Sequence, residues 1–138
     1  MKEQLVSFET AKLAKEKGFN ESCIHGYLNK DGSLMNDDVH FDFDSCYNDR
    51  SVMKHLSFKN SEVINDYSTT APTQSFLQKW LREVHNLIVI VDWGPLSKKY
   101  SYEIYHNGKD YGVEYVNDSY EEALEEGLIE ALKLIQQQ

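Results

Sequence analysis

The sequence predicts an α+β domain in which helices pack on an antiparallel sheet. Asn107 and Gly108 stand between two segments of alternating apolar and polar residues, and this dipeptide is typical of a two-residue type I′ turn. We therefore expect residues 100–106 and 109–116 to form a hairpin. Residues 119–135 follow directly and carry apolar residues at the spacing of an amphipathic helix. This helix is expected to cover the apolar face of the hairpin.

The N-terminal part begins with a predicted short helix. Ser7 is its expected N-cap, and Gly18 is expected just past its C-terminus. A short strand is predicted at residues 23–28, and residues 34–35 return beside it after a turn. Residues 45–70 show no sustained period, and we expect loops there with one short strand or helical turn.

Pro72 marks the start of a second predicted helix, over residues 72–85. Its apolar side chains, expected to face the core, are Phe76, Leu77, Trp80, Leu81 and Val84. Its polar side chains, expected in solvent, are Gln74, Gln78, Lys79, Arg82 and Glu83. Residues 87–91 form the next strand, and because both of its faces are apolar we expect it to be central and covered on both sides. It completes a three-stranded meander over about residues 87–116.

The turn also predicts which hairpin residues face each other. Pairing about it sets Ile104 opposite Tyr111, and Tyr100 opposite Tyr115, on one apolar face. Tyr105 lies on the other face and is expected to point outward.

The C-terminal helix has a clear start and one unusual residue. Ser119 and Glu122 have the spacing of a capping box. Gly127 lies within the apolar stripe, where glycine weakens a helix by about 1 kcal/mol relative to alanine. We attribute its presence to close approach of a strand.

Composition limits the classes of function. The chain has 138 residues, of which 41% are hydrophobic, and this predicts a single domain over residues 1–138. Its net charge of −9 disfavours broad contact with nucleic acids or anionic membranes. The longest apolar run, residues 87–91, is far too short to span a membrane. Cys23 and Cys46 do not form a C-x-x-C motif, and we expect free thiols in the cytoplasm.

Several segments resemble a family of small uncharacterised proteins from phages and mobile elements of gut bacteria. They are residues 6–12 and 15–19, 71–75 and 78–85, and 120–128 with 134–135. The resemblance implies a cytoplasmic protein of mobile-element origin. That family has no established activity, so the resemblance implies no catalytic residue and no cofactor.

One candidate site lies on an acidic segment. His40, Asp42 and Asp44 would share one face of a strand and offer nitrogen and oxygen ligands to a divalent cation. A metal-dependent enzyme or a metal-binding domain would use this face. The alternative is a solvated acidic face without a ligand.

Two further groups of residues bear on function. Cys23 and His25 would lie on the same strand face, as a nucleophile and its base would, although buried thiols are ordinarily small hydrophobic residues. The residues expected on an interaction surface are Asp37, Asp38, Arg82, His85 and Tyr105. Arg82 could receive a carboxylate or phosphate of a partner, or pair with a carboxylate of this chain.

These observations favour a non-enzymatic cytoplasmic interaction or accessory module that binds a host protein. A homodimer remains open. One special form of this hypothesis is an acidic mimic of nucleic acid that inhibits a host protein, since carboxylate arrays complement basic sites. The metal-dependent enzyme is the alternative from another class.

Overall fold

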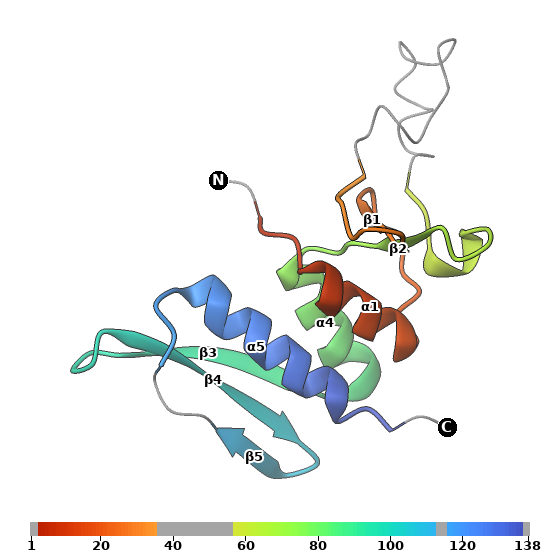
Figure 1. Cartoon of the computed structure of the whole chain (residues 1–138). Helices are drawn as coiled ribbons and strands as arrows, with labels where there is room; N and C mark the ends of the chain where they lie inside the picture. The colour runs from red at the N-terminus through yellow and green to blue at the C-terminus, as the bar shows by residue number, and fades with distance from the viewer. Residues whose placement is uncertain (1–2, 36–56, 113–115, 137–138) are drawn as a thin grey trace. The chain divides into compact units, whose positions relative to one another are not determined.

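A computed structural model describes residues 3–35, 57–112 and 116–136 (Figure 1). The chain divides into two compact units, and the single domain over residues 1–138 stays a prediction. The N-terminal unit consists of Ser7–Pro72, and the C-terminal unit combines Met1–Val6 with Thr73–Gln138.

The N-terminal unit begins with helix α1, Phe8–Glu16. The side chain of Ser7 accepts a backbone N–H of the first turn, as its position predicts. At the other end Gly18 takes a left-handed conformation with φ of +97°, and the N–H of Phe19 donates to the carbonyl of Ala14 at 2.9 Å. These contacts form a Schellman motif, so both predicted ends of the helix are confirmed to within one residue.

Two short strands complete this unit. Strand β1, Gly26–Leu28, pairs antiparallel with β2, Ser68–Thr70, and Leu34 bridges to Tyr27. The predicted strand and its return are therefore confirmed, with the strand starting later than expected. In the range 45–70, where one short strand or helical turn is expected, the described residues 57–70 contain both the helical turn η1, Asn60–Glu62, and the strand β2.

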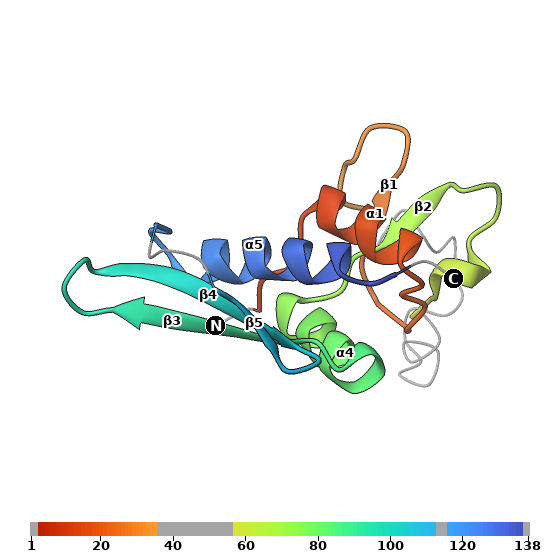
Figure 2. The same ribbon diagram turned by 90° about the horizontal axis from the view of Figure 1, so that it is seen from below.

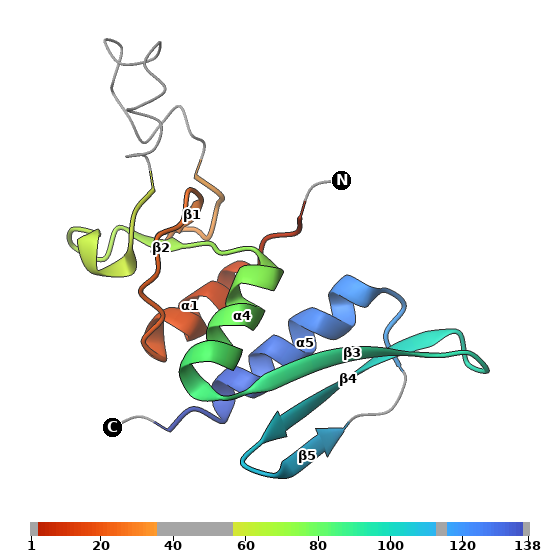
Figure 3. The same cartoon turned by 180° about the vertical axis from the view of Figure 1, so that it is seen from behind.

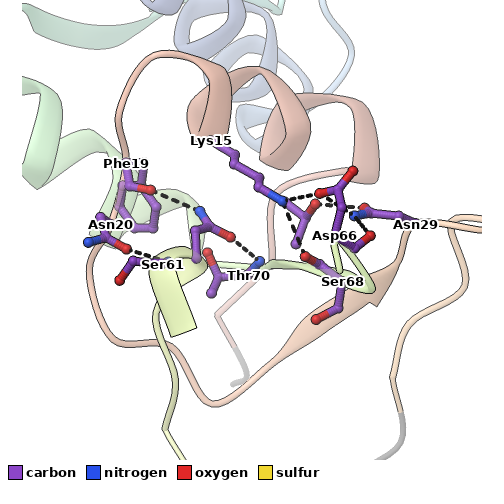
Figure 4. Close-up of polar contacts among 10 residues, drawn as sticks. Lys15, Phe19, Asn20, Asn29, Ser61, Asp66, Ser68 and Thr70 are labelled. Atoms are coloured by element: carbon purple, nitrogen blue, oxygen red, sulfur yellow. Dashed lines mark hydrogen bonds and ion pairs between the residues drawn. The ribbon is translucent and has the colours of Figure 1, made fainter. Parts of the chain in front are cut away.

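Asn60 connects two distant parts of the N-terminal unit. Its amide nitrogen donates to the carbonyl of Phe19 at 2.8 Å, and its amide oxygen accepts the N–H of Thr70 at 2.9 Å (Figure 4). Thr70 is fully buried, so water cannot replace this acceptor.

Asn60→Ala is expected to lower the free energy of unfolding of the N-terminal unit by about 1–2 kcal/mol, because the N–H of Thr70 loses its acceptor. Urea denaturation and hydrogen exchange at the Thr70 amide measure the effect. Ser61→Ala is the matched control. The Ser61 side chain is exposed, and its hydrogen bond to Asn20 is donated by the backbone N–H, which the substitution keeps. Equal stability of the two variants would contradict the prediction.

The C-terminal unit contains helix α4, Gln74–His85. The hydroxyl oxygen of Thr73 accepts the N–H of Phe76 at 3.1 Å, which makes Thr73 the N-cap. The helix therefore begins two residues later than the position of Pro72 predicts. Asn86, with φ of 54°, ends it as expected.

The buried side of α4 differs from the prediction at both ends. Leu77, Trp80 and Leu81 are buried, but Val84 is 58% exposed. Helical spacing aligns Val84 with Leu77, yet periodicity does not tell how far along a helix its neighbours extend. Gln74, expected in solvent, is also buried.

The burial of Gln74 has a clear physical basis. Its side-chain amide donates to the carbonyl of Glu121 and to a carboxylate oxygen of Glu125, both at 3.0 Å. Its backbone N–H donates to the carbonyl of Gln4. A polar side chain can be buried when such partners satisfy it.

The sheet of this unit consists of β3, Ile88–Gly94, β4, Lys99–His106, and β5, Lys109–Gly112. All pairs are antiparallel and the order is β3-β4-β5, so the predicted three-stranded meander is confirmed. Its middle strand is β4. The strand expected to be central, β3, is an edge strand among the described residues.

The hairpin register is confirmed close to the turn and shifts further away. Asn107 and Gly108 both have positive φ, at 53° and 78°, and Ile104 pairs with Tyr111. Tyr100, however, exchanges two backbone hydrogen bonds with Asn117. The predicted pairing of Tyr100 with residue 115 is therefore wrong by two residues.

Helix α5, Tyr120–Lys133, covers one face of this sheet. The Ser119 hydroxyl oxygen accepts the N–H of Glu122 at 3.1 Å, which confirms the predicted cap. The carboxylate of Glu122 accepts the N–H of Asp118. The buried residues of α5 are Ala123, Leu124, Gly127, Leu128, Ala131 and Leu132. The helix lies in front of β3 in Figure 1 and behind it in Figure 3, and Figure 2 shows it along one side of the strands.

Candidate interaction surface

The two faces of the β3-β4-β5 sheet differ in burial. Val89, Tyr102 and Ile104 are buried on the face that α5 covers. Ile88 and Ile90 alternate to the opposite face, where they are 36% and 43% exposed. The expectation that this strand is covered on both sides is therefore wrong among the described residues: α5 covers one side, and the isoleucines of the other side are partly exposed.

We call the side away from α5 the open face. By alternation and register its side chains are Ile88, Ile90, Asp92, Lys99, Ser101, Glu103, Tyr105 and Asp110, of which Ser101 is buried. Ile88 lies opposite Tyr105, which in turn lies opposite Asp110 on β5. Ile90 lies opposite Glu103. The two isoleucines and the tyrosine thus adjoin three carboxylates.

The electrostatics of the open face are visible at Tyr105. Its hydroxyl donates to a carboxylate oxygen of Glu103 at 2.7 Å. This hydrogen bond, with the charges of Asp110, Glu103 and Asp92, raises the pKa of Tyr105 to about 12. The phenol therefore stays protonated at neutral pH and lies in a negative potential.

Positive charge from the strands does not offset these carboxylates. Lys99, at one end of β4, forms an ion pair with Asp118. Lys109 pairs with His106 and alternates to the side that carries Ile104. Within the described part of the sheet, the open face therefore combines apolar side chains with net negative charge.

Of the three predicted interaction residues that the structure describes, Arg82, His85 and Tyr105, only Tyr105 lies on this face. The ring of His85 packs edge-on against Trp80, with centroids 4.6 Å apart. Burial, and then the nearby His106, lower the pKa of His85. Arg82 is exposed on α4, and no carboxylate of the described residues forms an ion pair with it.

The other predicted residues fall in a stretch outside the described residues. They are Asp37, Asp38, His40, Asp42, Asp44 and Cys46. The metal-binding hypothesis therefore stays a prediction. Among the residues that are described, no group of three histidine, cysteine or carboxylate side chains is arranged to hold a metal ion.

Cys23 is described, and its surroundings do not activate it. The thiol is buried, and its sulfur lies 3.6 Å from the carbonyl oxygen of Glu21. Burial raises its pKa from 9.0 to about 11. These features fit the alternative of a small hydrophobic residue better than a nucleophile.

We expect Cys23 to react slowly with an aromatic disulfide reagent at about pH 8, because a pKa two units higher leaves about 100-fold less thiolate. The rate is measured in a Cys46→Ser background, folded and then unfolded in urea. His25→Ala is the control for the predicted pair and should not change the rate. Equal rates in the folded and unfolded chain, or a rate that depends on His25, would contradict this expectation.

A polar network in the N-terminal unit is satisfied internally. Lys15 forms an ion pair with Asp66, and the amide of Asn29 donates to the carbonyl of Asp66 at 2.7 Å (Figure 4). The hydroxyl of Thr69 donates to the amide oxygen of Asn29 at 2.7 Å. Asp66 has a positive φ of 52°, so these contacts hold a strained turn next to β2. We assign the network a structural role.

Sequence reasoning missed the two isoleucines of the open face. An apolar run such as residues 87–91 is also typical of a strand that is covered on both faces, so the run alone does not predict that alternate residues are exposed. A better signal is the neighbouring strand. Tyr105 is expected to face outward, and a β3 strand paired beside it must place alternate residues on the same outward face.

The chain matches no family model, no curated protein and no solved structure. The resemblance to proteins of phages and mobile elements therefore stays a prediction. In the described parts of the chain, no helix has the length and apolar character needed to cross a membrane.

Proposed function

We propose that this chain is a non-enzymatic protein-binding module whose docking surface is the open face. The observation that carries the proposal is the partial exposure of Ile88 and Ile90 beside Tyr105. The uncovered face of an antiparallel sheet is ordinarily polar, so adjacent isoleucines there are typical of a surface that a partner covers.

The chemistry of the described side chains supports binding rather than catalysis. Cys23 is held in its thiol form, and His85 packs against Trp80. Tyr105 keeps its proton and presents an aromatic ring and a hydroxyl, a combination enriched at binding hot spots. A host protein is the partner that we propose, in line with the mobile-element resemblance.

Selection from a random peptide library displayed on phage tests this function, with the full chain as bait. We expect peptides that bind the wild type and lose about tenfold or more of their affinity for Ile90→Ser, since a central apolar contact is lost. Leu96→Ser is the matched control, because Leu96 is fully exposed outside the strands. Circular dichroism verifies that each variant is folded.

Two results would overturn the proposal. One is that no peptide distinguishes Ile90→Ser from the wild type. The other is that Leu96→Ser weakens binding as much as Ile90→Ser, which would show general stickiness of exposed apolar residues.

A further inference from the structure

The charge of the open face restricts what can cover it. Asp92, Glu103 and Asp110 contribute three carboxylates, and Lys99 is already paired with Asp118. A partner that buries Ile88 and Ile90 must also approach these charges. Complementarity therefore requires positive side chains at the margins of an apolar contact.

The dimensions of the face restrict the occupant as well. Three strands spaced about 4.8 Å apart present a surface about 10 Å wide, which is close to the diameter of one helix with its side chains. Strand β3 has seven residues and is therefore about 24 Å long, the length of a helix of about 16 residues. The opposite face of the same sheet is covered in this manner by the 14-residue helix α5 (Figure 2).

Other occupants fit these observations less well. A second copy of the chain would set another three carboxylates against Asp92, Glu103 and Asp110, and such like charges repel. An added strand at the free edge of β3 would meet Gln78 of α4, whose side chain already donates to the carbonyl of Val89 at 2.7 Å. Nucleic acids and anionic membranes are negatively charged, as the open face is, and are therefore repelled by it.

We infer that the open face binds an amphipathic α-helix of a partner protein, with an apolar stripe on Ile88, Ile90 and Tyr105 and flanking lysine or arginine residues on the carboxylates. This inference rests on the proposed function, because it specifies the partner of the same surface. In this binding mode the apolar side of an amphipathic helix packs against an apolar surface of the protein that binds it.

Three synthetic peptides of about 16 residues test the inference with the full chain. The first carries a leucine and isoleucine stripe at helical spacing with lysine elsewhere. The second replaces every lysine with glutamate, and the third scrambles the stripe while keeping the composition. Fluorescence anisotropy at about 50 mM and 300 mM salt should show the first peptide binding at least about tenfold more tightly than the others, and less tightly at high salt.

A pair of charge variants locates the effect on the open face. Glu103→Gln combined with Asp110→Asn should weaken the lysine peptide by about tenfold or more. Glu121→Gln combined with Glu126→Gln also removes two negative charges, but from the exposed side of α5. This control should weaken binding of the lysine peptide by less than about twofold. Equal losses would show attraction to the acidic chain as a whole and would overturn the inference.

The two proposals fail in different ways. If library peptides depend on Ile90 but carry no basic residues, and the lysine peptide does not displace them, the open face binds a partner of another kind. In that case the helix inference is wrong and the proposed function stands. If no peptide depends on Ile90, both are wrong.

Discussion

Leu81→Ala is expected to lower the free energy of unfolding of the C-terminal unit by about 2–5 kcal/mol. The Leu81 side chain is fully buried on α4. Its truncation loses the transfer free energy of the removed carbons and leaves a cavity that neighbours fill only in part. Urea denaturation followed by far-UV circular dichroism measures the change.

Val84→Ala is the matched control on the same helix. Sequence periodicity predicts that Leu81 and Val84 both lie on the apolar side of α4, but the Val84 side chain is 58% exposed. Its truncation should change the free energy of unfolding by less than about 0.5 kcal/mol. A Val84→Ala loss as large as that of Leu81→Ala would contradict the orientation of α4.

Gly127→Leu is expected to destabilise the same unit by about 1–3 kcal/mol through overpacking. A Cβ atom at Gly127 would lie 2.8 Å from Cγ1 of Val89 and 3.1 Å from Cβ and Cγ of Tyr102. Val89 is β-branched and Tyr102 lies on the middle strand, so neither can move without disturbing the sheet. Chemical denaturation of the purified variant measures the loss.

Glu126→Leu provides the control for Gly127→Leu. Residue 126 is exposed on the same turn of α5, so the added leucine meets solvent and stability should stay within about 0.5 kcal/mol. A Gly127→Leu variant that melts at or above the wild-type temperature would show that the close approach does not exist.

The helix ends and the tight turn could be predicted because their physics is local. Ser7 and Ser119 each accept an N–H three residues along the chain. Asn107 and Gly108 take up the positive φ that a type I′ turn requires. Gly18 does the same at the end of α1. Each of these interactions lies within a few residues, so short sequence patterns contain it.

The candidate surface could be predicted only in part. Tyr105 points away from α5, as the alternation of the hairpin indicates. The exposure of Ile88 and Ile90 could not be predicted from their own strand, since it depends on the side of the sheet on which the distant helix α5 packs.

By itself, the sequence determined the identity of the helices, the meander and the sharp turn at Asn107, because caps, periodicity and turn chemistry act over short distances. Only the tertiary structure decided that β3 is an edge strand among the described residues, that Gln74 is buried, and that Tyr100 pairs with Asn117. These features depend on contacts between residues far apart in the chain. The open face follows from the same contacts, since α5 covers one side of the sheet and leaves the isoleucines of the other side partly exposed beside its carboxylates.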